Sequence, residues 1–154
     1  QPPLATARCR KIDTDLVVVP ILRAGVGMLE GILELVPTAR VGFVGLYRDE
    51  ETKQPVSYYE RFPPQTKGGT CIIIDPMLAT GGSTVAAIDI LKENGADNIV
   101  VVCIVTCPEG IKAVEDAHPN VRIYAAAIDE KLNENKYIVP GLGDAGDRLF
   151  GTLQ

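Results

Sequence analysis

One stretch of the chain combines an acid, a Gly-rich turn and hydroxyl side chains in an order that suits a phosphorylated sugar. Asp75 follows the apolar run Cys71 to Ile74, and Thr80-Gly81-Gly82-Ser83 comes shortly after it. Paired glycines let backbone N–H groups point toward one anion, and the helix expected next favours negative charge at its N-terminus. We expect Ser83 or Thr84 to cap that helix. The pattern indicates a phosphate-binding turn beside a carboxylate that could bind ribose hydroxyls.

The alternative interpretation is an ordinary strand-turn-helix with a Gly-rich connection. The buried strand, the acid and the hydroxyl side chains around the turn favour the phosphate site over this reading. The stretch is not a P-loop, because no Lys follows the glycines.

A second turn of the same kind follows the apolar run Leu16 to Leu22. Here Arg23 precedes Gly25 and Gly27 and supplies a permanent positive charge that matches phosphate oxygens. Gly25, Gly27 and Gly31 nearly form the dinucleotide pattern G-x-G-x-x-G, but the third glycine comes one residue late. An Arg inside the turn suits pyrophosphate better, so the dinucleotide interpretation is the weaker one.

The segment from Gly141 to Gly146 does match G-x-G-x-x-G, yet too little chain follows for the helix and second strand that a dinucleotide fold needs. We interpret it as a loop that brings backbone groups close to a small flat ligand, with Asp144 as a further acceptor. A plain turn is the alternative.

Arg48 ends a second predicted strand. We expect it to reach toward phosphate, although a solvated charge run over residues 48–51 is the simpler interpretation. The polar segment 49–64, with a short hairpin expected around residues 56–59, could act as a lid over the site.

Apolar strands and amphipathic helices alternate along the chain. We expect strands at 16–22, 40–47, 70–74, 99–106 and 121–128, helices at 28–36, 84–94 and 108–117, and an irregular segment from residue 131. Gly95 should end the second helix and Pro108 should lie in the first turn of the third. This alternation predicts an α/β fold: an open, mostly parallel sheet with helices on both faces, a Rossmann-like three-layer arrangement in a single domain over residues 1–154.

The composition narrows the function further. The 154 residues carry a net charge of −5, which argues against a nucleic-acid surface, and no apolar run is long enough to cross a membrane. The four cysteines form no C-x-x-C pair, and three lie in or beside apolar runs, as buried thiols in a reducing cytoplasm do. The sequence has one histidine, His118, so a His-rich metal site is excluded. The single histidine also argues against a Ser-His-Asp or Cys-His catalytic site.

Together these motifs resemble those of uracil phosphoribosyltransferases, which are type I phosphoribosyltransferases. The resemblance covers nearly the whole chain and rests on the stretches 21–25, 45–48, 75–83, 108–110 and 137–147. Related phosphoribosyltransferases usually carry two consecutive acids before the Thr-Gly-Gly turn. Here Pro76 stands in the second position, which is the uracil-type variant.

The resemblance implies a role for each motif. The ribose and 5-phosphate of phosphoribosyl pyrophosphate (PRPP) would be bound by Asp75, Pro76, Met77, Leu78, Ala79, Thr80, Gly81, Gly82 and Ser83. Arg23 and Arg48 would bind its pyrophosphate side, and uracil would be read by Ile138, Gly143, Asp144 and Ala145, with Asp144 also facing PRPP. Arg23, Asp75 and Asp144 are the expected catalytic residues. Mg²⁺ would accompany the pyrophosphate, and no protein residue is assigned as its ligand.

The resemblance also implies the products UMP and pyrophosphate, hence pyrimidine salvage in the cytoplasm, in a homo-oligomer (a dimer or higher). GTP is a candidate allosteric effector, because some family members respond to it. Relative to the family we expect the chain to lack an N-terminal, mostly helical segment. Three other functions are kept: a regulatory protein that binds PRPP or nucleotide on this fold, a phosphoribosyltransferase for another base, and a dinucleotide-dependent enzyme.

Overall fold

The computed structural model describes residues 4–6, 8, 10–49, 51–52 and 54–152. Its elements follow in the order β1 (Leu16–Leu22), α1 (Val26–Leu35), β2 (Arg40–Val41), β3 (Phe43–Arg48), β4 (Pro55–Arg61), a 3₁₀ turn η1 (Pro64–Thr66), β5 (Thr70–Ile74), β6 (Met77–Leu78), α2 (Gly82–Glu93), β7 (Asn98–Thr106), α3 (Pro108–Ala117), β8 (Arg122–Ile128), β9 (Lys131–Leu132), β10 (Ile138–Val139) and α4 (Ala145–Phe150). The predicted alternation of strands and helices is confirmed. Within the described residues, no helix has the length and apolar character needed to cross a membrane.

The main sheet is parallel except at one edge. Its strands lie in the order β4-β3-β1-β5-β7, with β8 beside β7. The short strand β2 pairs with the first half of β1, and β3 pairs with the end of β1. Only β4 runs antiparallel, against β3. Chain order moves from β1 outward to β3 on one side and from β5 outward to β7 on the other. The direction therefore reverses between β1 and β5, and in open α/β sheets ligands bind at the carboxyl ends of strands at such a point.

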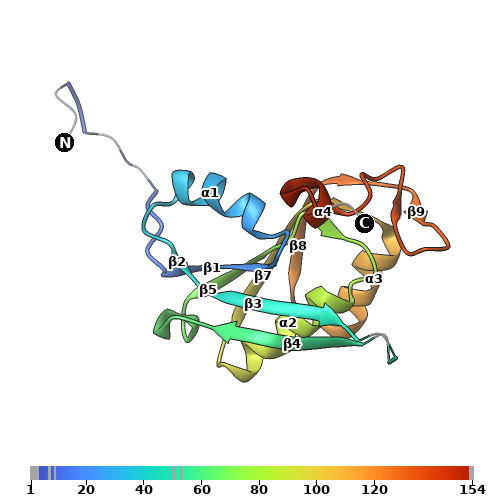
Figure 1. Cartoon of the computed structure of the whole chain (residues 1–154). Helices are drawn as coiled ribbons and strands as arrows, with labels where there is room; N and C mark the ends of the chain where they lie inside the picture. Colours follow the sequence, from blue (N-terminus) through green and yellow to red (C-terminus); the bar gives the residue numbers. More distant parts are fainter. Residues whose placement is uncertain (1–3, 7, 9, 50, 53, 153–154) are drawn as a thin grey trace.

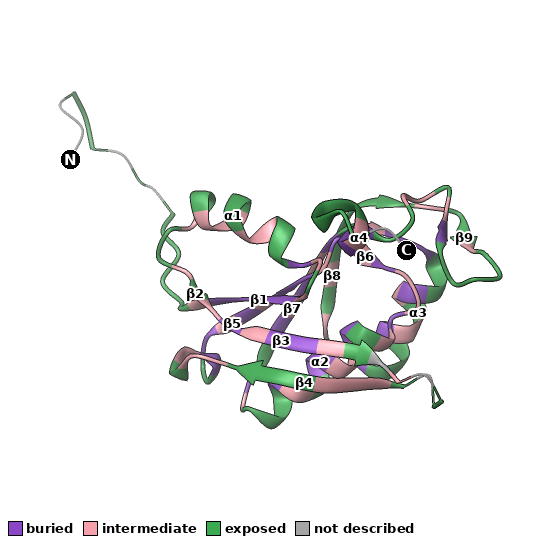
Figure 2. Ribbon diagram, in the orientation of Figure 1, coloured by how far each residue is buried: buried purple, intermediate pink, exposed green. Residues whose placement is uncertain are grey.

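Helices lie on both faces of the sheet, as predicted: α1 on one face, α2 and α3 on the other (Figure 1). The face under α2 and α3 holds the continuous core, in which alternate residues of β1, β5 and β7 meet Ile88, Leu91 and Val114. Those three helix residues are fully buried. On the other face α1 has no buried residue, and Figure 2 shows the contrast with the buried central strands. The packing that holds the loops in place therefore comes mainly from one face.

The strand that carries the predicted phosphate motif is interrupted in the middle. β5 pairs with the first half of β7 and β6 pairs with its end, and Asp75 and Pro76 lie between them. The Pro76 carbonyl accepts hydrogen bonds from the N–H groups of both Ile104 and Val105, at 3.1 and 3.0 Å. The break therefore stays bonded to β7, to which the Asp75 N–H also donates, at the Val102 carbonyl, 3.2 Å away.

Two segments differ from the sequence-based expectation. Residues 56–59 form no hairpin of their own; they belong to β4, which pairs along the whole of β3. The segment after residue 131, expected to be irregular, contains the β9–β10 hairpin and the short helix α4. These elements have two, two and six residues, which is too short to leave a periodic pattern in the sequence.

The expected cap of α2 is also wrong. Gly81, with a φ of +82°, precedes the helix, and no side chain caps its first turn; Ser83 and Thr84 lie inside it. The other helix signals are confirmed. Gly95 ends α2 with a φ of +86°, and Pro108 begins α3.

Gly25 is where the turn after β1 packs directly on the backbone of the neighbouring strand. A Cβ there would lie 2.5 Å from the Ile74 carbonyl oxygen and 2.7 Å from the Ile21 nitrogen, whereas a Cβ at Gly31 in α1 would meet nothing. We therefore expect Gly25→Ala to lower the free energy of unfolding by about 2–3 kcal/mol through overpacking. Gly31→Ala should raise it by about 0.5–1 kcal/mol, because it removes a helix glycine. Denaturant unfolding measures both free energies. The same change for Gly25→Ala and Gly31→Ala would contradict the close approach of Gly25 to the Ile74 carbonyl.

Candidate active site

A cavity of about 410 Å³ opens along the Gly-rich turn between β6 and α2. It is lined by Asp75, Met77, Ala79, Thr80, Gly81, Ser83, Thr84, Asn135, Lys136, Tyr137 and Asp144. Residues 75–84 of this lining lie between the end of β5 and the first turn of α2, and the others come from the loop of the β9–β10 hairpin and from the N-cap of α4. The cavity beside the Gly-rich turn is thus completed by residues of the C-terminal segment.

A second cavity of about 230 Å³ adjoins the first. Its lining comprises Ala24, Asp75, Met77, Ala79, Lys136, Tyr137, Ile138, Gly143, Asp144, Ala145 and Gly146. The predicted base-reading residues Ile138, Gly143, Asp144 and Ala145 are therefore all together here. Six residues line both cavities: Asp75, Met77, Ala79, Lys136, Tyr137 and Asp144. The two carboxylates thus lie at the junction, where a reacting centre would face both sides.

The carboxyl group of Asp75 is held in an environment that disfavours its charge. Its oxygen accepts a hydrogen bond from the Met77 N–H at 3.3 Å. Burial nevertheless raises the pKa of Asp75 to about 7, and the nearby negative charge of Asp144 adds to the increase. The pKa of the buried Cys103 thiol is raised to about 11, mainly by burial and further by Asp75. A cation or hydroxyl groups of a ligand at this carboxyl would favour its ionised form.

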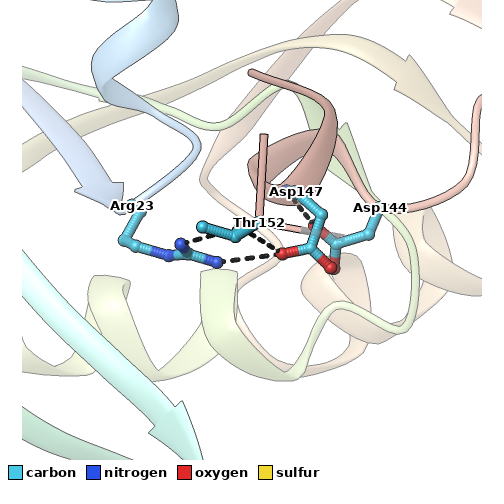
Figure 3. Close-up of polar contacts among 4 residues, drawn as sticks. All are labelled: Arg23, Asp144, Asp147 and Thr152. Carbon is cyan, nitrogen blue, oxygen red and sulfur yellow. Dashed lines mark hydrogen bonds and ion pairs between the residues drawn. The ribbon is translucent and has the colours of Figure 1, made fainter. Parts of the chain in front are cut away.

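Asp144 connects the cavities to the first turn of α4. It is the N-cap of that helix, and its side chain accepts a hydrogen bond from the Asp147 N–H at 2.8 Å. Asp147 in turn forms an ion pair with Arg23, with 3.2 Å between Oδ1 and Nη2 (Figure 3). The turn after β1 is therefore bonded to the C-terminal helix.

Four of the predicted site residues that the structure describes line neither cavity: Arg23, Pro76, Leu78 and Gly82. Arg23 lies beside the smaller cavity, near Gly146, and more than half of its side chain is exposed. Arg48 ends β3, and its side chain is outside the described part of the structure. Pro76 and Leu78 are buried, with carbonyls that bond to β7. Their positions do not support direct contact between these two side chains and a ligand.

Lys136 and Tyr137 line both cavities, although sequence reasoning did not single them out. Lys136 is the one described non-glycine residue with a positive φ, +66°, and this strained turn lets the hairpin loop face the cavities. It is also the only cation that lines them among the described residues. A basic residue in a left-handed turn leaves no periodic signal, so the sequence gives little reason to choose it. The lid expected over 49–64 contributes no described residue to either lining.

Comparison with known proteins identifies the family. The family model described as uracil phosphoribosyltransferase matches residues 1–152. The chain belongs to the uracil phosphoribosyltransferase family. A uracil phosphoribosyltransferase of Enterococcus faecalis is 64% identical over 135 residues, covering 88% of this chain and 65% of its own length. One of Geobacillus kaustophilus is 60% identical over 151 residues, covering 97% and 72%. The chain thus spans about two thirds to three quarters of the length of these relatives.

Solved structures share the fold of this chain. A protein of Aquifex aeolicus superposes with a TM-score of 0.80 at 48% identity, over 88% of this chain and 64% of that one. A purine phosphoribosyltransferase of Pyrococcus horikoshii has a TM-score of 0.57 at 16% identity, over 76% and 75%, which shows a shared fold. The predicted type I phosphoribosyltransferase fold is confirmed, and so is the resemblance stated from the sequence motifs.

The raised pKa of Asp75 makes the stability of this family member depend on pH. The native state holds the Asp75 proton more tightly than the unfolded chain does, so stability should fall as pH rises from about 4 to about 7. Asp75→Asn removes the buried charge and keeps an acceptor for the Met77 N–H. The variant should be more stable than the parent at pH 8, by on the order of 2 kcal/mol. This difference should be smaller at pH 5, where the parent carries Asp75 in its neutral form. Denaturant midpoints at both pH values check this; a gap that does not change with pH would contradict it.

Proposed function

We propose that the whole protein transfers the 5-phosphoribosyl group of PRPP to N1 of uracil, giving UMP and pyrophosphate. It would thus be a pentosyltransferase of pyrimidine salvage. The observation that carries the proposal is the pair of adjoining cavities that share Asp75 and Asp144. One cavity follows a turn suited to a phosphorylated sugar and the other follows a loop suited to a small flat base. The bond to be formed would lie where they meet.

The larger cavity suits the phosphoribosyl half. Gly81 turns the chain into α2, and the first turn of that twelve-residue helix has no side-chain cap. Backbone N–H groups at the start of a helix bind phosphate well. Ser83 lines the same cavity, and Asp75, which also lines it, suits the ribose hydroxyls. Hydrogen bonds from those hydroxyls would favour the ionised form of the carboxyl.

The smaller cavity suits the base. Ile138 and Ala145 are buried in its wall and give an apolar surface, while the loop between them brings backbone groups to the edge of a planar ligand. Gly143, with a φ of +79°, provides the bend that this close approach requires. Uracil, with alternating donors and acceptors around a flat ring, matches backbone N–H and C=O groups.

Arg23 and Arg48 would stabilise the charge on the departing pyrophosphate. Such fixed donors act most strongly where negative charge develops in the transition state. Asp144 lies beside the predicted uracil site and would accept the N1 proton, directly or together with a backbone carbonyl. His118 cannot do so, because it is buried against Lys92 and Asp89, away from the residues that line the cavities.

The residues present fit a Mg²⁺ ion that is held mainly by the substrate. Mg²⁺ usually binds one or two carboxylates together with phosphate oxygens and water. Asp75 and Asp144 are the two carboxylates that line both cavities, and no cluster of three or more acidic, His or Cys ligands exists among the described residues. Bound there, the ion would neutralise pyrophosphate charge. Asp75 is thus its proposed protein ligand, and Asp144 remains the proposed acceptor of the N1 proton.

Three further proposals for the whole protein rest on the family resemblance: a homo-oligomeric state, a response to GTP and a cytoplasmic location. The net charge of −5 supports the expectation that no nucleic acid is bound.

The proposed reaction is tested by following UMP formation from uracil, PRPP and Mg²⁺, with hypoxanthine and adenine as alternative bases. We expect product with uracil alone. Asp144→Asn should lower kcat by about 10²-fold if Asp144 assists proton transfer, because positioned general bases contribute on that order. Product with a purine and none with uracil would assign another base. PRPP binding without any transfer would support the regulatory alternative.

Arg23→Ala should lower kcat/KM for PRPP by an amount equivalent to about 2–4 kcal/mol, as is typical for the loss of a preorganised donor to developing charge. Steady-state kinetics at varied PRPP measures this. An unchanged kcat/KM in a folded variant would show that Arg23 does not face pyrophosphate.

A further inference from the structure

The side chain of Arg23 is fixed at two points by the C-terminal segment. Its Nη2 donates to Asp147 Oδ1 at 3.2 Å and its Nη1 donates to Thr152 Oγ1 at 3.1 Å. The Thr152 hydroxyl donates to the same Asp147 oxygen at 2.7 Å, which closes a small network (Figure 3). The Phe150 ring lies 5.8 Å from the guanidinium carbon. Arg23 is therefore oriented by residues more than 120 positions away in sequence.

This network leaves most of the guanidinium available. An Arg side chain has five N–H donors, and these two contacts use one on each terminal nitrogen. The side chain is 53% exposed, whereas that of Asp147 is 25% exposed. The guanidinium is thus held from one side and faces solvent on the other, where phosphate oxygens could bind.

Asp147, which binds Arg23, lies in the same turn as the predicted base-reading residues. Asp144 lines both cavities and bonds to the Asp147 N–H. Between them, Gly146 lines the smaller cavity, and a Cβ there would lie 3.6 Å from Arg23 Nη2. A shift of this turn on occupation of the smaller cavity would therefore move the atoms that orient Arg23.

We propose that Asp147 is a positioning residue that, with Thr152, aims Arg23 at the pyrophosphate group and couples Arg23 to the base loop. The proposal rests on the proposed function for the identity of the ligand. Holding a long side chain in its binding orientation before the ligand arrives reduces the rotamer entropy that binding would otherwise lose. Asp147 touches no substrate in this account; it acts through Arg23.

The variants are chosen to separate this role from simple stabilisation. Asp147→Asn keeps the shape and an acceptor but removes the charge, and Thr152→Val removes the hydroxyl at nearly constant volume. Asp116→Asn is the matched control, since Asp116 pairs with Lys112 at 2.8 Å in an exposed ion pair on α3, away from the site. Arg23→Ala and the double variant Arg23→Ala/Asp147→Asn complete a cycle.

The experiment is calorimetric titration of the full chain with PRPP and Mg²⁺, followed by steady-state kinetics with uracil. We expect Asp147→Asn to raise the Kd for PRPP about tenfold and Thr152→Val to raise it several-fold, with Asp116→Asn unchanged. In the Arg23→Ala background, Asp147→Asn should have no further effect, because its action passes through Arg23. A thermal unfolding curve for each variant identifies any that do not fold.

Two outcomes would overturn the proposal. Equal PRPP affinity of Asp147→Asn and the parent would show that the ion pair only joins two parts of the surface. Tighter binding by Asp147→Asn would show that Asp147 competes with the ligand for Arg23. Failure of the proposed function is separate: the parent itself would then bind no PRPP, or would bind it and transfer nothing to uracil.

Discussion

The parallel pairing of β1 with β5 is the constraint on which the rest of the site depends. Its register aligns Leu16 to Pro20 with Thr70 to Ile74, so the chain leaves both strands at the same edge of the sheet. Because strand order reverses between these two strands, the turn that carries Arg23 and the break that carries Asp75 flank one crevice. Gly25 fits directly against the Ile74 carbonyl, which fixes the distance between the two turns. A one-residue slip in this pairing would separate the functional loops and also move Val17, Val19 and Ile21 to the opposite face of the sheet, away from the core.

The crevice combines an apolar wall with a carboxyl group that is costly to ionise. The break after β5 leaves Asp75 with the Met77 N–H as a partner, close to Asp144 and Cys103. A site of this kind is less stable without its ligand, because burial and the nearby charge of Asp144 both oppose ionisation of Asp75. The same arrangement favours a ligand that brings hydroxyl groups and a divalent cation. The same acids therefore lower the stability of the ligand-free protein and raise its affinity for such a ligand.

Local patterns predicted the framework well and the contacts between its parts poorly. The continuous apolar runs gave β1 and β5 with the observed bounds, and Gly95 and Pro108 marked helix ends as expected. The cap expected from Ser83 or Thr84 was wrong, because Gly81 takes the chain into the helix earlier. The motif at Asp75 was visible because its acid, glycines and hydroxyls are contiguous. The bond between Arg23 and Asp147 joins residues 124 positions apart, and no local pattern contains it.

That long separation has a consequence for synthesis of the protein. Arg23 is made early, whereas Thr152 and the α4 helix are made more than a hundred residues later. A parallel sheet with such non-local contacts cannot finish its functional centre until the late residues have left the ribosome. Before that moment the Arg23 guanidinium lacks both of the partners that orient it. Nascent chains that stop short of α4 would therefore carry Arg23 without its positioning contacts.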